Sequence, residues 1–394
     1  MKQVQEFSHK GKYCKKLRIA FVHNYYIHYR VPLFKALSRV FHVKFFFDDV
    51  YEYVKKPEKE LDFVINKGPR IKGIRLPVTL LFHLLKQRPH LVIAGDSTYP
   101  STLIAFLTSK MLRAKFILWE ERWFWHSSLL SNLLWPFSRT VALKADALIV
   151  PGTLSKEFYK NIGVEKGRIF VAPNASYVDI NEEIKNRARA LRRKLGLDNK
   201  IVVLYIGRVI PLKGVHLILK ALTKINEYNL HLLIPGTFVD PWYKRLLDDI
   251  VKASKLESKV TMLSLKFVRV EDRGIYYELA DIVCYPSYYE AWGMVVNEAA
   301  YAGKPVISTR TCAAAYDILF GHPELVIPPG NVEELAKSLK LLAMDANKRK
   351  AIGMELKRLI SEKYSYEEML KGFLKAIKYT LVNQLTEQSQ NKLD

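Results

Sequence analysis

Two cationic side chains lie in a glycine-bounded loop in the second half of the sequence. Arg208 and Lys213 lie between Gly207 and Gly214, after an apolar stretch typical of a buried strand and before one typical of a helix. Ligands of parallel α/β sheets bind beyond the carboxyl ends of strands, where glycine lets the backbone approach a phosphate. Arg208 and Lys213 are therefore candidate catalytic groups for neutralising a diphosphate, and Gly207 is a candidate donor contact. The alternative is a strand-to-helix turn with two solvated cations.

Two glutamates follow a later strand pattern. Glu290 ends the loop after that pattern, and Glu298 lies in an apolar helix expected from about Trp292 to Ala302. Helical side chains lean toward the helix N-terminus, so the Glu298 carboxylate would point toward amides that could hold a phosphate. We expect Glu298 to bind a sugar diol beside that phosphate, and Glu290 to contact a sugar on its far side. A surface glutamate is the alternative for Glu298, but a carboxylate among small apolar neighbours needs a partner.

Strand-like and helix-like segments alternate along the chain, which predicts parallel α/β sheets. In the first half, candidate strands lie at 17–22, 43–47, 91–94, 115–119, 147–150 and 169–172, with a helix at 31–40. In the second half they lie at 201–206, 231–234, 260–263, 282–285 and 306–308, with helices at 332–344 and 366–382. The charged helix expected at 182–195 has few apolar positions, and we interpret it as the connection between two domains.

Taken together, the motifs resemble those of the family 4 (group 1) retaining glycosyltransferases. Glu290 and Glu298 are separated by seven residues between Pro-Ser and Ala-x-Gly-x-Pro-Val, and Arg208 and Lys213 match the family's Arg-x4-Lys-Gly loop. The resemblance covers residues 200–345 well and the first half loosely. It implies the GT-B fold, in which two Rossmann-like domains face each other across a cleft.

The resemblance also assigns the domains. Residues 1–180 would form the acceptor-binding domain and residues 181–365 the nucleotide-sugar-binding domain. A C-terminal helix within residues 366–394 would return toward the N-terminal domain and end in a polar tail.

The resemblance implies a role for each candidate residue. Glu298 would hold the ribose hydroxyls of a UDP-, GDP- or ADP-sugar, and Glu290 would contact the donor sugar. The two cations would neutralise the diphosphate leaving group, with the amides of Gly293, Met294 and Val295 beside it. It further implies retention of the anomeric configuration, a sugar or lipid-linked acceptor, and neither a metal nor another cofactor. The sequence lacks an Asp-x-Asp motif, and two cations with a helix dipole can do a metal's electrostatic work. A sugar epimerase or a phosphorylase on the same fold is the alternative.

The first half departs from the family in its sugar-contacting loops. It carries the run His23 to Arg30 where many members have a Gly-Gly loop, and the run Trp119 to Arg122 where many have a histidine. We expect Asn24 and Glu120 to contact the acceptor or a sugar. The alternative for both is a turn or helix cap.

The charge of the chain is strongly positive and unevenly distributed. The formal net charge is +23, and residues 1–180 contain 29 Lys or Arg against 14 Asp or Glu. Such a field attracts polyanions or an anionic membrane, although solubility alone is the alternative. Aromatic and leucine-rich stretches at Leu76–Phe82 and Trp123–Trp135 suit an interfacial helix on anionic lipid, with a core-facing helix as the alternative.

Other classes of protein fit the sequence less well. We find no nucleic-acid recognition motif and expect no nucleic-acid partner. The sequence has no apolar run long enough to span a membrane, and its three scattered cysteines have no metal or disulfide spacing. We therefore expect a cytoplasmic enzyme, peripheral on the inner face of the cell membrane.

Overall fold

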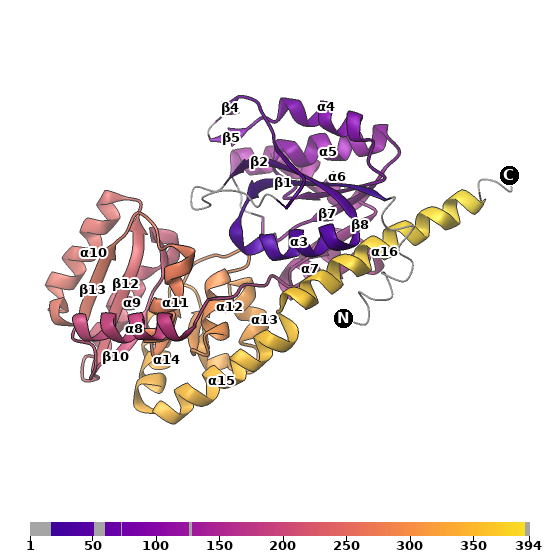
Figure 1. Cartoon of the computed structure of the whole chain (residues 1–394). Coiled ribbons are helices and arrows are strands. Elements are labelled where there is room, and N and C mark those ends of the chain that lie inside the picture. Colours follow the sequence, from indigo (N-terminus) through magenta and orange to yellow (C-terminus); the bar gives the residue numbers. More distant parts are fainter. Residues whose placement is uncertain (1–16, 51–59, 72, 126–127, 391–394) are drawn as a thin grey trace. The chain divides into compact units, whose positions relative to one another are not determined.

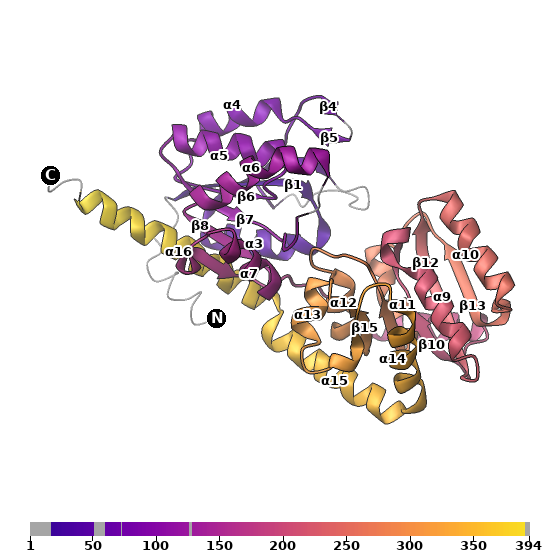
Figure 2. The ribbon, with the colours of Figure 1, turned by 180° about the vertical axis from the view of Figure 1, so that it is seen from behind.

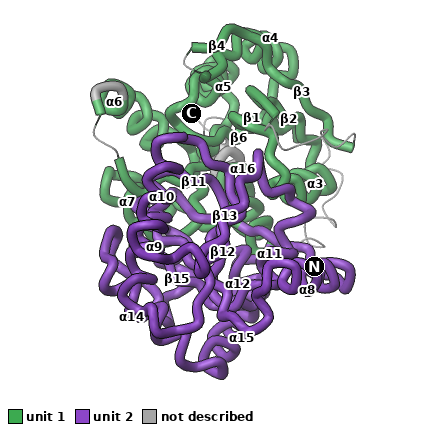
Figure 3. The backbone as a smooth tube through the Cα atoms, turned by 90° about the vertical axis from the view of Figure 1, so that its left-hand side faces the viewer, with its two compact units in different colours: residues 1–174, 366–394 green, residues 175–365 purple. Residues whose placement is uncertain are grey.

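A computed structural model describes residues 17–50, 60–71, 73–125 and 128–390 of the chain. The chain divides into two compact units, which Figure 3 shows in two colours. Unit 1 comprises residues 1–174 and 366–394, and unit 2 comprises residues 175–365. Each unit contains a parallel sheet with helices on its faces (Figures 1 and 2). The predicted pair of Rossmann-like α/β sheets is therefore confirmed.

The sheet of unit 1 has the strand order β3-β2-β1-β6-β7-β8-β9, and every neighbouring pair is parallel. Strands β6 and β8 are buried along their whole length, as the unbroken apolar runs in the sequence predicted. The order reverses direction between β1 and β6, so their carboxyl ends form the switch point where ligands of such sheets bind. The strands are β1 (Arg18–Tyr26), β2 (His42–Val50), β3 (Phe63–Ile65), β6 (Leu91–Gly95), β7 (Lys115–Trp119), β8 (Ala147–Val150) and β9 (Ile169–Val171).

Helices cover the sheet of unit 1, and a small antiparallel hairpin, β4 (Arg70–Ile71) with β5 (Ile74–Arg75), precedes α4. The long C-terminal helix α16 packs against β7, β8, β9 and α3. Its Phe373 ring lies 5.1 Å from that of Trp119, which anchors this distant segment in the core of unit 1. The helices are η1 (His28–Arg30), α3 (Val31–Val40), α4 (Val78–Gln87), α5 (Pro100–Met111), α6 (Leu129–Lys144), α7 (Thr153–Asn161), η2 (Lys166–Arg168) and α16 (Tyr366–Gln390).

In the sheet of unit 2, strand β10 lies between β12 and β14. Strand β12 also pairs with β11 and β13, and β14 continues through β15 to β16, all in parallel. The order reverses direction between β10 and β14, which places the switch point of this unit at their carboxyl ends. The strands are β10 (Ile201–Leu204), β11 (Gly207–Val209), β12 (Leu230–Phe238), β13 (Val260–Ser264), β14 (Ile282–Tyr285), β15 (Val306–Thr309) and β16 (Val326–Ile327).

Two helices of unit 2 begin at polar N-cap residues that can be recognised in the sequence. Asn331 and Asp345 accept backbone N–H bonds at the starts of α14 and α15, as N-cap residues do. The helices are α8 (Glu182–Lys194), η3 (Pro211–Lys213), α9 (Val215–Lys224), α10 (Pro241–Ala253), η4 (Glu257–Lys259), η5 (Val270–Asp272), α11 (Arg273–Leu279), α12 (Met294–Tyr301), α13 (Ala313–Ile318), η6 (Pro323–Leu325), α14 (Val332–Met344) and α15 (Ala346–Lys363).

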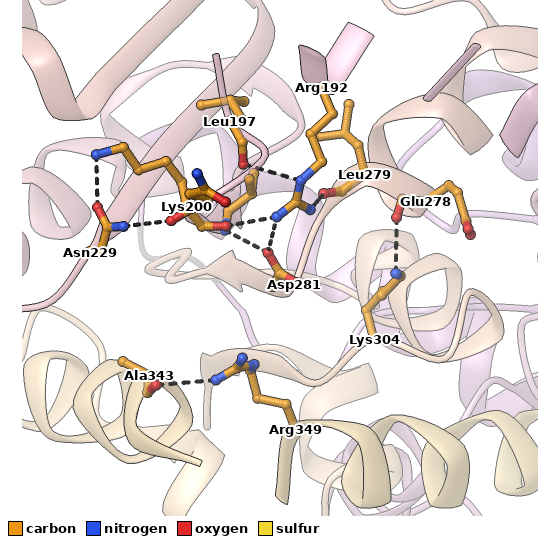
Figure 4. A network of polar contacts seen from close by, with 12 residues as sticks. Arg192, Leu197, Lys200, Asn229, Glu278, Leu279, Asp281, Lys304, Ala343 and Arg349 are labelled. Atoms are coloured by element: carbon orange, nitrogen blue, oxygen red, sulfur yellow. Dashed lines mark hydrogen bonds and ion pairs between the residues drawn. The ribbon is translucent and has the colours of Figure 1, made fainter. Parts of the chain in front are cut away.

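Helix α8 is an anchored part of unit 2, which corrects its interpretation as a simple connection. Its Arg192 donates hydrogen bonds to the carbonyls of Leu279 (2.6 Å) and Lys200 (2.7 Å) and to the carboxylate of Asp281 (3.1 Å), as Figure 4 shows. The apolar positions Ile184 and Ala188 are buried as well. With the Leu197 carbonyl (3.2 Å), this one arginine satisfies four acceptors and so fixes a helix that offers little apolar surface.

The boundary between the units lies at residue 174, slightly before the position of 180 expected from the sequence. The segment 175–180 belongs to unit 2 because the carbonyl of Asp179 lies directly against Gly274 of helix α11. A Cβ atom at Gly274 would come within 1.9 Å of that oxygen, so only glycine permits the approach.

Candidate functional site

The switch point of unit 2 brings two of the predicted residues into direct contact. Lys213 lies in η3 after β10 and β11, and its ammonium forms an ion pair with the Glu290 carboxylate, which follows β14. Both side chains are mostly buried, at 9% and 14% exposure. The two loops are also joined by backbone, since the Tyr288 amide donates to the carbonyl of Leu212 (2.9 Å). The cation is therefore held in place by the loop that carries the glutamate.

Glu290 is positioned by groups around it. Its amide donates to the Thr311 carbonyl (3.0 Å), and its carboxylate accepts a hydrogen bond from the Tyr285 hydroxyl (2.6 Å). Burial, with the charge of Glu290 beside it, raises the pKa of Tyr285 well above the ordinary value for tyrosine. Tyr285 therefore stays protonated and keeps donating to the carboxylate.

Arg208 and Gly207 lie on β11, at the open side of the same loop. The Arg208 side chain is exposed, in contrast to Lys213. Gly207 has φ +134°, and no atom lies within 4 Å of the place where a Cβ would stand. This backbone is therefore accessible to a ligand, as the sequence predicted for a phosphate contact.

The start of helix α12 provides the predicted amides. Gly293 has φ +104°, and a Cβ there would come within 2.4 Å of the Cys312 sulfur, so this turn requires glycine. Met294 and Val295 form the first turn and are half-buried, while the following residues are buried. A helix start of this kind favours an anion through its free amides and its dipole.

Glu298 is buried at 3% exposure and has the partners that the sequence argument required. Its carboxylate accepts hydrogen bonds from Arg273 (2.7 Å), from the hydroxyl of Tyr277 (2.8 Å) and, more weakly, from Ser176 (3.4 Å). Burial raises the pKa of Tyr277 well above the ordinary value, so its hydroxyl remains a donor. Arg273 also forms an ion pair with this buried carboxylate, which gives it the partner that a buried acidic group needs.

The sequence argument missed Arg273, Tyr277 and Tyr285. Arg273 and Tyr277 are four residues apart on α11 and so share one face of that helix. This spacing was visible in the sequence, but nothing indicated that the face lies against Glu298. Tyr285 was assigned only to a buried strand.

The weaker candidates in unit 1 lie at the ends of β1 and β7. Asn24 is half-buried, and its side chain accepts the amide of Tyr25 (2.8 Å). Glu120 is buried at 3% exposure and accepts hydrogen bonds from the amide (2.9 Å) and hydroxyl (2.6 Å) of Ser97. Burial raises the pKa of Glu120. As placed, its carboxylate fixes the loop after β6.

Asp96 is a further candidate at the switch point of unit 1. It follows β6 with φ +61°, a conformation that non-glycine residues rarely adopt outside functional or turn positions. Its carboxylate is paired with Arg122 (3.3 Å) and is about one-third exposed. The sequence argument treated this segment only as the end of a strand.

The described residues contain neither a metal-binding cluster nor a membrane-spanning helix. Among these, no group of three or more His, Cys, Asp or Glu residues is arranged to hold a metal ion. In the same part of the chain, no helix is both long and apolar enough to cross a membrane.

Comparisons with known proteins agree with the motifs. The sequence model of the family "Glycosyl transferases group 1" matches residues 188–358, which carry the loop of Lys213, Glu290 and Glu298. This segment is therefore similar to the group 1 glycosyltransferases. Its motifs lie at the switch point of the second sheet, and the fold of the chain is GT-B.

Curated relatives and a solved structure extend this result. The chain is 28% identical over 253 residues to a D-inositol 3-phosphate glycosyltransferase of Rhodococcus jostii, covering 62% of this chain and 54% of that one. It is 25% identical over 241 residues to a lipopolysaccharide 1,2-N-acetylglucosaminetransferase of Salmonella typhimurium, covering 59% and 61%. The match thus spans little more than half of each relative. The crystal structure of Anabaena HepE in complex with UDP has a TM-score of 0.73 at 17% identity, covering 92% of this chain and 100% of that one, and so shares its fold.

Proposed function

We propose that this chain transfers a sugar from a nucleoside diphosphate sugar to a hydroxyl of a sugar or lipid-linked acceptor, with retention of the anomeric configuration and without a metal ion. The observation that carries the proposal is the pairing of Lys213 with Glu290 at the switch point of unit 2, with Glu298 held by Arg273 on the neighbouring helix. A nucleotide-binding sheet needs an anion site and a ribose site at this place, and these residues offer both.

Lys213 has a task that fits its environment. When the bond between sugar and phosphate breaks, negative charge grows on the leaving diphosphate. We assign the stabilisation of that charge to Lys213, Arg208 and the amides at the start of α12, and such groups act most strongly where water is excluded. In the proposed cycle, the diphosphate takes Lys213 away from Glu290, and the released carboxylate accepts hydrogen bonds from hydroxyls of the donor sugar.

We infer a nucleoside diphosphate sugar as donor from the similarity to the group 1 glycosyltransferases. The nucleotide itself is to be found by testing three candidates. HepE was crystallised with UDP, so a uracil nucleotide is the first to test, followed by GDP and ADP. The names of the two relatives point to polyol and glycan hydroxyls as acceptors of those proteins. We extend that acceptor class to this chain as part of the proposal.

The test combines a lysine variant with a chelator. We expect Lys213→Ala to reduce kcat at saturating donor by roughly 100-fold or more, because an interaction that strengthens in the transition state is lost. Release of nucleoside diphosphate from UDP-, GDP- and ADP-sugars measures the rate, and NMR of the product gives the anomeric configuration. Activity should persist in EDTA.

The matched control is Lys220→Ala, which removes an exposed lysine on helix α9 of the same unit. It should leave kcat unchanged. Equal activity in the wild type and Lys213→Ala would refute the role of Lys213. Loss of activity in EDTA that Mn²⁺ or Mg²⁺ restores would refute the metal-free mechanism, and an inverted product would refute retention.

A further inference from the structure

Unit 1 exposes a cluster of large apolar side chains on helix α4 and the hairpin before it. The most exposed are Phe82 at 66%, Ile71 at 64% and Val78 at 58%. Soluble proteins rarely leave apolar side chains exposed in such a group, and a patch of this kind indicates a binding surface. We call the set the α4 face; it consists of Ile71, Ile74, Leu76, Val78, Leu81, Phe82 and Leu85.

Helix α4 is apolar on two opposite sides. Leu80 and Leu84 are fully buried against the core of unit 1. The exposed positions Val78, Leu81, Phe82 and Leu85 follow the spacing i, i+3, i+4 and i+7, so they form one stripe along the helix. A surface helix normally has polar residues on its outer side. The inner side of α4 packs against the protein core, so its outer apolar stripe is suited to contact another apolar environment, such as lipid.

Hydrogen bonds connect the hairpin β4–β5 to the start of α4, so the residues of the α4 face are held in a defined arrangement. The amide of Lys67 donates to the Thr79 hydroxyl (2.9 Å), and the amide of Leu76 donates to the carbonyl of Pro69 (2.8 Å). Figures 1 and 2 both show the hairpin beside the start of α4. The exposed isoleucines of the hairpin thus lie next to the apolar stripe.

The charged residues of the segment that carries the α4 face are all cationic. Residues 63–95 contain six Lys or Arg and no Asp or Glu. Lys67, Lys86 and Arg88 are exposed, whereas Arg70 and Arg75 pair with Asp49. Apolar side chains with cations around them are typical of elements that lie on anionic lipid. Two copies of this face would bring like charges together, which disfavours self-association.

We propose that the α4 face docks unit 1 on an anionic membrane surface. Cations draw the face to the lipid headgroups, and Phe82 and its neighbours insert shallowly into the boundary between headgroups and acyl chains. The docking itself is independent of the proposed function; only its use, bringing the enzyme to a membrane-presented acceptor, rests on that function.

The structure moves the docking surface away from the Trp123–Trp135 stretch that the sequence favoured. The Trp125 and Trp135 rings pack on each other, with centroids 4.5 Å apart, and the Arg122 guanidinium lies 4.5 Å above Trp125. Two of the tryptophans expected to insert are thus engaged within unit 1. His126 and Ser127 lie outside the described residues, as do the side chains of Leu129 and Leu130.

The test sediments the full chain with vesicles of phosphatidylcholine alone and of phosphatidylcholine with phosphatidylglycerol, at low and high salt. We expect sedimentation only with the acidic vesicles, and release as salt rises. Phe82→Glu should weaken vesicle binding at least tenfold, because it replaces an inserting ring by a charge of the wrong sign. Lys67→Gln combined with Lys86→Gln should weaken it by about fivefold for each lysine.

Two phenylalanine variants serve as matched controls. Phe320→Glu changes a ring that is 83% exposed on unit 2, and Phe137→Glu changes one that is 55% exposed on α6. Neither should alter vesicle binding. The proposal is overturned if the wild type stays in the supernatant with acidic vesicles, if Phe82→Glu binds like the wild type, or if the wild type is a dimer that Phe82→Glu dissociates.

The outcome is distinguishable from that of the proposed function. Sedimentation needs no donor or acceptor, and release of nucleoside diphosphate with a soluble acceptor is measured separately. Phe82→Glu should keep the wild-type rate in that soluble assay, since it lies in neither proposed binding site.

Discussion

Glu298 is a buried side chain that already has hydrogen-bond partners within unit 2. Arg273 and Tyr277 both donate to it, so the carboxylate is oriented without a ligand. An oriented carboxylate loses less entropy when it accepts hydrogen bonds from a ribose than a flexible one would. Arg273 and Tyr277 therefore act as positioning residues for the predicted ribose site.

The first prediction concerns this residue. Glu298→Ala should weaken nucleotide binding by about 2–3 kcal/mol, the range for hydrogen bonds to a charged group. Calorimetry with the nucleoside diphosphate that binds the wild type measures the change. Arg273→Gln should produce a smaller loss in the same direction, because the glutamate remains but is less firmly held.

The control for this experiment is Glu271→Ala, which removes an exposed glutamate two residues before Arg273. Its affinity should equal that of the wild type. Removing Glu298 also leaves the Tyr277 hydroxyl without its carboxylate partner, so each variant must first give a wild-type circular dichroism spectrum. Unchanged affinity in a folded Glu298→Ala chain would disprove the ribose assignment.

At the level of single residues, the sequence indicated candidate groups but not which side chains contact them. Residue types and spacing pointed to Lys213, Glu290 and Glu298, whose roles remain predictions. The contact between Lys213 and Glu290 spans 77 residues, and the contact of Glu298 with Arg273 spans 25. Such contacts depend on strand order, which local patterns do not determine.

At the level of elements, prediction was most accurate for buried strands and weakest for charged helices. The strands at 115–119, 147–150 and 282–285 agree with β7, β8 and β14, since uninterrupted apolar runs between polar turns define them. Helix α15 was not assigned, although its buried residues Ile352, Leu356 and Ile360 recur every four positions. Its many lysines and arginines obscured that period. The hairpin β4–β5 has strands of only two residues, too short for any alternation to appear.

Strand β12 shows how tertiary pairing overrides a local signal. The sequence analysis placed this strand at 231–234, just before Pro235 and Gly236, two residue types that are typical of turns. The structure continues the strand to Phe238, where Gly236 and Thr237 pair with Gly207 and Arg208 of β11. The pairing holds the backbone of the predicted phosphate loop at the edge of a sheet, which local propensity could not indicate.

Helix α11 links the packing of unit 2 to its site, and this gives an element-scale prediction. Gly274 lies against the Asp179 carbonyl, between Arg273 and Tyr277 on the same helix. Gly274→Ala would place a Cβ about 1.9 Å from that oxygen, so α11 must shift. Overpacking of this kind costs roughly 1–3 kcal/mol, and we expect a lower melting temperature together with weaker nucleotide binding.

The comparison variant is Gly321→Ala, where the nearest atom to the added Cβ is the Glu355 carboxylate oxygen at 3.9 Å. It should melt and bind nucleotide like the wild type. If Gly274→Ala melted at a lower temperature but bound nucleotide normally, α11 would support the fold without positioning Glu298.

At the scale of the whole molecule, the predicted tasks separate between the two units. The anion and ribose groups all lie in unit 2, whereas the exposed apolar α4 face lies in unit 1. The positive charge is also concentrated in the first half, with 29 Lys or Arg against 14 Asp or Glu in residues 1–180. Nucleotide binding and membrane docking should therefore respond to different variants.

This separation leads to a prediction for the intact chain. A nucleoside diphosphate that binds only the folded protein stabilises it by mass action, by about 2.7 kcal/mol at a concentration 100 times Kd. For chains of this size that corresponds to a rise in melting temperature of several degrees. Comparing UDP, GDP and ADP at one concentration should therefore rank the donors, with the cognate nucleotide giving the largest rise.

Hydrogen exchange locates the effect. In the presence of the cognate nucleotide, peptides covering residues 207–216 and 273–298 should exchange more slowly, because the predicted phosphate and ribose contacts lie there. Peptides covering α4, residues 78–87, should exchange at the same rate with and without nucleotide, and should instead slow when acidic vesicles are added. Protection by nucleotide confined to unit 1 would contradict the assignment of the donor site to unit 2. If residues 207–216 were protected but residues 273–298 were not, the assignment of the phosphate contact would stand. The assignment of Glu298 as the ribose ligand would be rejected.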